Sequence, residues 1–276
     1  MIYTDWHIHS EASYDATLTL KEIAEGAKQR GYVNFGITDH VNYNDDKFLG
    51  DMKRSVDSVK EFQKECPEII LGVELTPIPK PTFDYVAKTG TREGFTLPES
   101  AKPYDIELAQ TKEQLKAFGV RYAVCAAHAR LDVTNPKEAP LDRDAYIKEW
   151  YRQQMWLASD ERTTILGHPW WTSKNVWYDD FSVIPHSMNT DIAAVLKENK
   201  KYVECNEYFF RSDKTTDKFR HQYAEFLREL HETGIPVTYG SDSHRIFLNH
   251  DITVEYLTAA GFKDGDIVAV EPQDLW

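Results

Sequence analysis

Residues 1–10 read MIYTDWHIHS and carry two histidines, His7 and His9, at the end of a short apolar stretch. Side chains of a β-strand alternate between its two faces, so both imidazoles would point to the same side of a strand formed here. An isolated H-x-H pair is a weak signal, because a chain with ten histidines can contain one by chance. The pair gains meaning only if other metal-ligand side chains stand where the fold brings them close.

Six further apolar runs in the chain have the composition of strands. With the first run they are IYTDWH (2–7), VNFGITDH (33–40), IILGVEL (69–75), RYAVCAAH (121–128), TTILGH (163–168), YVECNEY (202–208) and PVTYGSD (236–242). Helical patterns separate most of them, at 19–31 and at roughly 48–65, 105–118, 142–160, 189–200 and 216–233. Strands that alternate with helices pair in parallel, so we predict an α/β fold. The pattern is compatible with a closed barrel and with an open sheet.

The first of these helices has clear start and stop signals. Thr19 and Glu22 have the spacing of a capping box, which satisfies free backbone N–H groups at a helix start. Leu20, Ile23 and Ala27 form an apolar stripe. Gly31 is the residue type that most often ends a helix.

Possible metal ligands stand at the carboxyl ends of six of the seven predicted strands. They are His7 and His9, with Asp15 following, then His40, Glu74, His128, His168, Asp242 and His244. In parallel α/β folds, ligands bind outside the carboxyl ends of the strands. We therefore predict a metal site at this edge. Ligation by imidazole and carboxylate without thiolate suits Zn, Mn or Fe.

The prediction depends on the whole set, because a single histidine such as His128 is usually an ordinary core or surface residue. Glu74 carries extra weight, since a buried carboxylate without a cation or hydrogen bonds is costly. Cys125 is excluded, because an offset of three from His128 places it on the opposite face of a strand. The remaining histidines stand away from strand ends, and we interpret them as surface residues: His186, His221, His231 and His250.

One connection, residues 77–104, is too long for an ordinary loop and contains five prolines and two glycines. Because it follows the strand of Glu74, we expect either an ordered excursion that covers the site or a surface insertion without a role.

The bulk composition limits the function classes. A net charge of −13 argues against a partner such as long nucleic acid, which proteins bind through clustered Lys and Arg. Three cysteines without a pairing pattern indicate a reducing, cytoplasmic location. The chain has no signal-peptide pattern and no apolar run long enough to span a membrane.

The ordered motifs H-x-H, T-D-H, a glutamate on the third strand, single histidines on the next two strands and S-D-x-H resemble the polymerase-and-histidinol-phosphatase (PHP) superfamily over about residues 3–245. The resemblance implies a distorted (β/α)7 barrel with the metal site at the carboxyl ends of its strands. It further implies one domain over residues 1–276, with an insertion at about 77–104.

The resemblance also implies two or three divalent metal ions. Carried over by position, one ion would be held by His7, His9, Glu74 and Asp242, and Glu74 would bridge to a second ion held by His128 and His168. A third would be held by His40, His244 and Asp15, a position where several family members have histidine. Two close cations lower the pKa of a bridging water and hold the attacking and leaving oxygens of a displacement at phosphorus.

The family branch closest in pattern suggests residues for the substrate. In VECNEYFFR (203–211), Glu204, Asn206 and Arg211 have the spacing seen in histidinol phosphatases, where this arginine contacts phosphate. We assign catalytic roles to Glu74, Asp242 and Arg211, and substrate binding to Arg211 and Asn206. Arg130 and Arg245 follow ligand histidines and are further candidates, unless each is an ordinary surface charge. A group of aromatic residues would line a substrate pocket, or pack an insertion or a subunit interface: Trp170, Trp171, Trp177, Tyr208 and Phe209.

The leading hypothesis is hydrolysis of a small phosphomonoester, with histidinol phosphate as first candidate. A phosphodiesterase or exonuclease acting on short nucleotides is a second hypothesis. A non-catalytic metal-binding or regulatory protein is a third, which the near-complete ligand set disfavours. The sequence specifies neither the ester, nor the metal, nor the oligomeric state.

Overall fold

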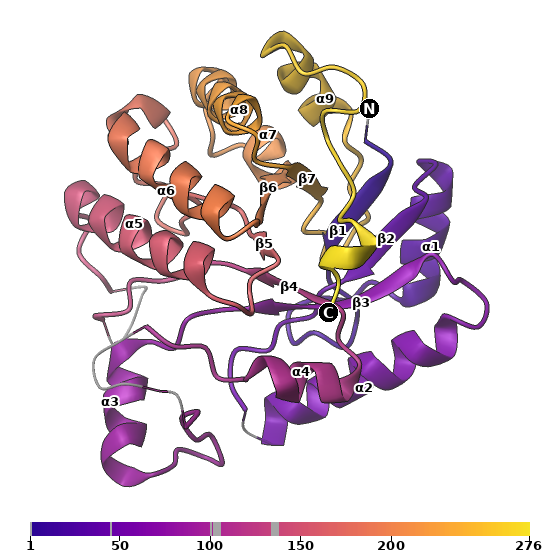
Figure 1. Cartoon of the computed structure of the whole chain (residues 1–276), viewed down its shortest axis with the longest axis vertical. Coiled ribbons are helices and arrows are strands. Elements are labelled where there is room, and N and C mark those ends of the chain that lie inside the picture. The colour runs from indigo at the N-terminus through magenta and orange to yellow at the C-terminus, as the bar shows by residue number, and fades with distance from the viewer. Residues whose placement is uncertain (1, 45, 100, 102–105, 134–137) are drawn as a thin grey trace.

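The computed structural model describes residues 2–44, 46–99, 101, 106–133 and 138–276. Within them, seven parallel strands follow one another in chain order around a single sheet (Figure 1). They are β1 (Thr4–Ile8), β2 (Asn34–Ile37), β3 (Ile69–Leu75), β4 (Tyr122–Cys125), β5 (Ile165–Leu166), β6 (Tyr202–Asn206) and β7 (Val237–Gly240). The chain beyond β7 returns to β1, because Asp242 N donates to His7 O at 2.7 Å and His9 N donates to Ser243 O at 2.9 Å. The sheet therefore closes into a distorted (β/α)7 barrel, as predicted.

Helices surround the ring of strands (Figure 1). They are α1 (Leu20–Gln29), α2 (Asp46–Phe62), α3 (Lys80–Thr89), α4 (Lys112–Phe118), α5 (Arg143–Ser159), α6 (His186–Glu198), α7 (Glu207–Arg211), α8 (Asp217–Glu232) and α9 (Asp251–Ala259), with short 3-10 turns at Phe181–Val183 and Pro272–Asp274. The predicted capping box of α1 is confirmed, since Thr19 and Glu22 bond each other's backbone N–H. None of the described helices combines the length and apolar character that crossing a membrane requires.

Several predicted elements are shorter in the structure, among them the strands predicted at 33–40 and 121–128. The helix predicted at 105–118 begins only at Lys112, because Thr111 and Gln114 form a capping box there, and residue 105 lies outside the described residues. The strand predicted at 163–168 is reduced to Ile165–Leu166. Beyond it the backbone of His168 takes a positive φ of 23°, which is incompatible with a strand.

The long connection after β3, predicted at 77–104, contains a helix in its described part. Pro79 and Pro81 occupy the start of α3, where the missing N–H of proline costs no hydrogen bond, and Gly90 ends the helix with a φ of 85°. Apolar side chains of this segment form a small core of their own with Ala109: Ile78, Phe83, Val86 and Phe95. Figure 1 shows α3 outside the ring of strands. Residues 100 and 102–104 of the predicted insertion lie outside the described residues.

The apolar core has two parts. The larger cluster lies between the strands and the helices that cover them. The smaller one contains strand residues and one residue of the C-terminal segment, and it fills the inside of the barrel: Trp6, Tyr122, Val124, Ile165, Tyr202 and Val270. The C-terminal segment crosses the amino ends of the strands, because Val268 N donates to Val237 O at 2.9 Å and Trp276 N donates to Arg121 O at 2.6 Å. The carboxyl ends remain available for a site.

Candidate metal centre

All nine predicted metal ligands gather at the carboxyl ends of the strands. Among the described residues they form three groups, whose donor atoms lie within 4.8 Å of one another: His7, His9 and Asp242; Glu74, His128 and His168; and His9, Asp15, His40 and His244. Two atoms that each lie about 2.2 Å from one ion are at most about 4.4 Å apart. Small side-chain shifts would therefore let each group hold an ion. The third group differs from the expectation by including His9.

Glu74 lies at the centre of the cluster and faces two sides. Its Oε1 lies 3.1 Å from His168 Nε2 and 3.2 Å from His128 Nε2. Its Oε2 lies 3.3 Å from the Nε2 atoms of His7 and His9, and 3.0 Å from His40 Nδ1. Only 1 % of the Glu74 side chain is exposed, so these imidazoles are its surroundings. One carboxylate thus joins separate donor groups.

The buried donor atoms fit a metal centre better than a self-contained hydrogen-bond network. Within the described part of the chain, the Nδ1 atoms of His9 and His168 are buried without a hydrogen-bond partner, and Glu74 Oε2 and His40 Nδ1 lie 3.0 Å apart without the geometry of a hydrogen bond. Buried polar atoms in native proteins are normally paired, and a cluster of unpaired ones needs an explanation. Carboxylate and imidazole donors without thiolate are the ligand set of Zn, Mn and Fe sites. The residues present therefore fit divalent ions.

The electrostatic state of the cluster also favours cations. Burial alone would raise the pKa of Glu74, but the imidazoles of His40 and His7 outweigh it and hold this pKa well below its usual range. Burial lowers the pKa of His40, and Glu74 and Asp15 more than compensate, raising it to about 10. Without metal, the carboxylates thus attract a proton onto the His40 imidazole. The same carboxylates would attract metal ions, which bind neutral imidazoles in place of protons.

A second buried carboxylate, Glu204 of β6, orients the ligands. Its Oε1 lies 2.7 Å from His7 Nδ1, and its Oε2 accepts a hydrogen bond from the backbone N–H of His168. Gly240 makes this approach possible, since a Cβ there would lie 1.9 Å from Glu204 Oε1. Metal-binding imidazoles commonly bond a carboxylate through their other nitrogen, which fixes the ring. Its position in an apolar strand is the same signal that indicates Glu74, and it could have pointed to this role from the sequence.

Two other polar residues support the ligands through hydrogen bonds. Asp39 of the T-D-H motif is buried and is not among the donor groups found; its carboxylate accepts hydrogen bonds from Ser10 N at 2.6 Å and Ser55 Oγ at 2.6 Å. Asp39 thereby fixes the turn after His9. Thr76 Oγ1 lies 2.9 Å from His128 Nδ1 and orients that ring.

The backbone at the site is strained. His168, Trp170 and Asp242 have positive φ angles of 23°, 67° and 54°. Residues other than glycine rarely adopt this region, and such outliers cluster at functional sites. At Asp242 this conformation directly follows β7, at the point where the chain turns back toward β1.

A cavity of about 470 Å³ opens beside the ligands. It is lined by Asp15, Trp171, Tyr208, Arg211, Ser212, Ser241, Asp242, His244, Arg245 and Leu248. The structure thus brings two of the predicted arginines to the metal cluster. Arg130 is not among the lining residues, and Asp132 accepts two hydrogen bonds from its guanidinium, at 3.0 and 2.6 Å. No described residue of the 77–104 excursion lines this cavity.

The predicted substrate residues Arg211 and Asn206 have defined partners. Arg211 Nε donates to Glu207 Oε1 at 3.2 Å, and its Nη2 donates to Asn249 O at 2.9 Å. Asn206 Nδ2 donates to Glu204 Oε2 at 3.2 Å and to Asp242 Oδ2 at 3.4 Å. Asn206 is fully buried, so it connects Glu204 with the ligand Asp242 and does not line the cavity.

Some residues of the predicted aromatic group line the cavity, and the others lie in the apolar core. Trp171 and Tyr208 line the cavity, and their rings lie 6.2 Å apart. Trp171 also lies 5.5 Å from the rings of both His128 and His168. The other three, Trp170, Trp177 and Phe209, are fully buried and belong to the main core. These three residues therefore pack in the core and do not line the cavity.

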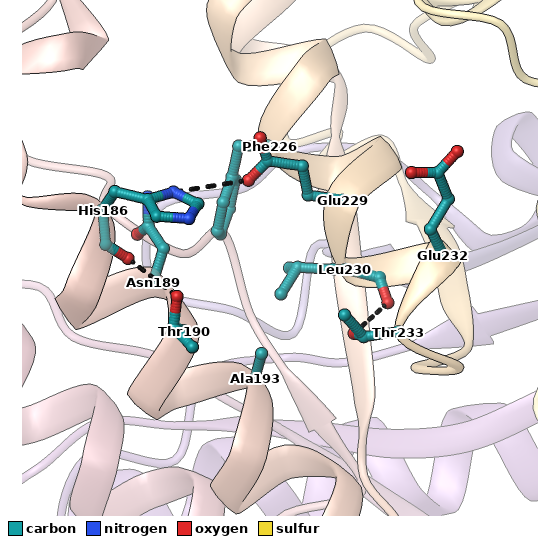
Figure 2. Close-up of a pocket in the computed structure, with 9 residues that line it drawn as sticks. All are labelled: His186, Asn189, Thr190, Ala193, Phe226, Glu229, Leu230, Glu232 and Thr233. Atoms are coloured by element: carbon teal, nitrogen blue, oxygen red, sulfur yellow. Dashed lines mark hydrogen bonds and ion pairs between the residues drawn. The ribbon is translucent and has the colours of Figure 1, made fainter.

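The histidines assigned to the surface are not all exposed. His186 and His221 are exposed, whereas His231 is half-buried beside Asp266. His250 is also half-buried, since its Nδ1 lies 2.7 Å from the hydroxyl of Tyr32. Figure 2 shows His186 at the edge of a second groove between α6 and α8, which contains none of the predicted metal ligands. Cys125 is fully buried and, as expected, is not among the donor groups found in the described residues.

Comparisons with known proteins show the family and the fold of the chain. A family model of the PHP domain matches residues 5–208. No curated protein matches the chain. A histidinol phosphate phosphatase (HISK) from Lactococcus lactis subsp. lactis Il1403, solved with zinc, L-histidinol and phosphate, has a TM-score of 0.63 at 15% identity, covering 99% of this chain and 98% of that chain.

Two further solved structures are less similar. An ochratoxinase from A. niger has a TM-score of 0.44 at 13% identity, covering 94% of this chain and 67% of its own. A zinc-bound IOLI protein has a TM-score of 0.40 at 11% identity, covering 94% of this chain and 86% of its own. The match of the family model spans more than half of the sequence. The chain therefore belongs to the PHP domain family.

Proposed function

We propose that the chain is a metal-dependent phosphomonoesterase that acts on a small metabolite. The observation that carries the proposal is Glu74, whose two oxygens face separate groups of buried imidazoles. Two or three divalent ions would be held by the nine ligands described above. When bound, such ions supply Lewis-acid stabilisation and a water nucleophile at neutral pH.

The side chains around the ligands have distinct tasks in this proposal. Glu74 keeps two donor groups at a fixed separation, and Glu204 keeps the His7 ring in one orientation. Asn206 holds Asp242 through its amide. Trp171 and Tyr208 form an apolar wall for the leaving group next to the cluster and exclude water from that side.

Arg211 is the proposed phosphate-binding residue. Its guanidinium lines the cavity with Arg245, on the same rim as Asp242 and His244. A guanidinium matches phosphate oxygens with a planar set of donors, which lysine does not reproduce. Charge increases on these oxygens as the transition state forms, so the contact should assist the chemical step as well as binding.

Histidinol phosphate is the first substrate to test. The similar HISK structure contains L-histidinol and phosphate, and the cavity here has aromatic side chains beside an arginine. The identity of 15% with that protein leaves the leaving group open, so a panel of phosphate esters should accompany it.

The test is hydrolysis by protein loaded with Mn or Zn. We expect turnover of p-nitrophenyl phosphate and little turnover of bis-p-nitrophenyl phosphate. Arg211→Ala should lower kcat/KM about 10²–10³-fold, the usual cost of removing one such donor, with metal content unchanged. Arg211→Lys should recover part of the loss. Arg228→Ala is the matched control, because Arg228 also pairs with a carboxylate four residues away but lies on α8.

Other outcomes decide against the proposal. Preference for the diester would indicate a phosphodiesterase. Absence of turnover with both compounds and with the ester panel, in protein that contains metal, would indicate a non-catalytic protein. Near-normal activity of Arg211→Ala would show that Arg245 or the metals alone bind the phosphate.

A further inference from the structure

Glu207 is a buried carboxylate outside the metal cluster, and its partners converge from three directions. It is the first residue of α7 and is fully buried. Its Oε1 accepts a hydrogen bond from Arg211 Nε at 3.2 Å. Its Oε2 accepts hydrogen bonds from the Tyr239 hydroxyl of β7, at 3.0 Å, and from the Thr253 hydroxyl of α9. The carboxylate is therefore fixed by elements that pack independently of Arg211.

The contacts of Arg211 leave one end of its guanidinium available. Nε is bound to Glu207, and Nη2 is bound to the backbone and side-chain oxygens of Asn249. Nη1 has no hydrogen-bond partner among the residues that the structure describes. The side chain is 34 % exposed and lines the cavity beside Asp242 and His244. Thus one edge of the guanidinium is anchored, and the other is accessible from the cavity.

We propose that Glu207 is the positioning residue for Arg211 and holds its guanidinium ready for the phosphate of the substrate. The inference rests on the proposed function, because it takes Arg211 as the phosphate ligand. A free arginine loses considerable rotamer entropy when it binds a ligand, whereas an anchored one has already lost it on folding. Supporting residues of this kind keep a binding group within a fraction of an ångström of its productive position.

A purely structural role explains the arrangement less well. Burial raises the pKa of Glu207 to about 7, and Thr253, Tyr239 and Arg211 oppose this rise. A buried charge pair is usually no more stabilising than apolar side chains of similar volume. α7, β7 and α9 already pack through Phe210 and Tyr239, which are fully buried. Burying this carboxylate thus disfavours the folded state, and the carboxylate holds the guanidinium of Arg211 in one position.

The experiment is a double-mutant cycle on metal-loaded protein. Four proteins are compared: wild type, Glu207→Gln, Arg211→Ala and the double variant. Calorimetry measures the dissociation constant of inorganic phosphate for each. Steady-state kinetics with p-nitrophenyl phosphate measures kcat/KM for each. Glu207→Gln should weaken phosphate binding about tenfold, the lower end of the cost of removing a supporting residue. Arg211→Ala should weaken it more. The double variant should equal Arg211→Ala, because Glu207 acts only through Arg211.

Two further variants keep the test decisive. Glu232→Gln removes the carboxylate of the equivalent pair with Arg228, at the groove shown in Figure 2, and should leave phosphate binding unchanged. If Glu207→Gln does not fold, Thr253→Val removes one hydrogen bond of the same side chain and leaves the glutamate itself in place. Thr253→Val should then weaken phosphate binding in wild type but not in Arg211→Ala.

The failures of the two proposals are distinguishable. Metal-loaded wild type that neither binds phosphate nor hydrolyses esters overturns the proposed function and this inference with it. Wild type that does both, with phosphate binding unchanged in Glu207→Gln, overturns the inference alone. Equal losses from Glu207→Gln in the presence and absence of the Arg211 side chain would do the same, since they indicate a structural role.

Discussion

Glu74 is the residue on which the metal centre depends most. Its carboxylate is within 3.3 Å of five imidazoles that come from the carboxyl ends of four strands or from the turns that follow them. Among the described residues, the peripheral ligand His40 has contacts with two carboxylates, Glu74 at 3.0 Å and Asp15 at 3.3 Å. Removing the central group should therefore disturb more of the site than removing the peripheral one.

At saturating metal, the kcat of Glu74→Gln should be about tenfold or more lower than the kcat of His40→Ala. Glutamine preserves the size of the side chain but not its charge, so two donor groups lose their shared ligand. His40 belongs to the group with His9, Asp15 and His244, so His40→Ala leaves the group of Glu74, His128 and His168 complete. Steady-state rates with p-nitrophenyl phosphate over a metal titration provide the measurement. Equal losses of kcat would contradict the central position of Glu74.

At this scale the sequence predicted the ligands but not all of their supports. His7, Glu74 and Asp242 were predictable because strand ends in parallel folds meet at one edge. Glu204 and Glu207 were not, because their partners come from other strands and helices and have no fixed spacing in the chain. Arg130 does not line the cavity, and the local carboxylate of Asp132 binds its guanidinium, which the sequence did not indicate.

At the scale of elements, the site depends on the close approach of β6, β7 and β1. Gly240 lies between Glu204 and His7, and a Cβ there would lie 1.9 Å from Glu204 Oε1 and 2.7 Å from His7 Cβ. A side chain at this position would push Glu204 away from the imidazole that it orients.

Gly240→Ala should lower the affinity for metal about 10–100-fold, the usual cost of disturbing a residue that orients a ligand. Overpacking should also destabilise the fold by about 1–3 kcal/mol. Gly50→Ala is the control, because a Cβ at this position in α2 meets nothing within 4 Å and a glycine-to-alanine change inside a helix gains about 1 kcal/mol. Metal titration and thermal unfolding measure both effects. Metal affinity of wild-type strength in Gly240→Ala would contradict the role of Glu204.

The elements themselves were predicted unevenly. Strand β3 has the bounds predicted for it, because its apolar run lies between Pro67 and Pro77. Helix α3 was missed because prolines mark a loop in the sequence, whereas here they occupy the start of a helix, where they are tolerated. Helix α4 starts at Lys112 and not near residue 105, because the capping box of Thr111 and Gln114 sets its first turn there.

For the whole molecule, the two ends of the barrel have separate tasks. The carboxyl ends hold the ligands, and the C-terminal segment closes the amino ends, with Val270 buried in the inner core. The sequence could not distinguish this closed barrel from an open sheet, because closure depends on contacts between β1 and the chain after β7. Only the family resemblance pointed to a barrel.

Removing residues 268–276 should therefore lower stability without removing the site. Burial of a side chain such as Val270 contributes about 1.5–3 kcal/mol, and each kcal/mol corresponds to ~2–4 °C in a chain of this size. A drop in Tm of several degrees is expected, with metal content per folded molecule unchanged. An unchanged Tm, or loss of metal at unchanged Tm, would show that the two ends are not separate.

The central claim is that the strand-end cluster is a metal centre, and the most direct test is the metal stoichiometry of the protein. The protein is prepared without chelators, supplied with Mn or Zn, freed of excess metal and subjected to elemental analysis. Three donor groups around Glu74 predict two or three ions per chain, and Glu74→Gln should retain fewer. Less than one equivalent in the folded wild-type protein after addition of either metal would contradict the account.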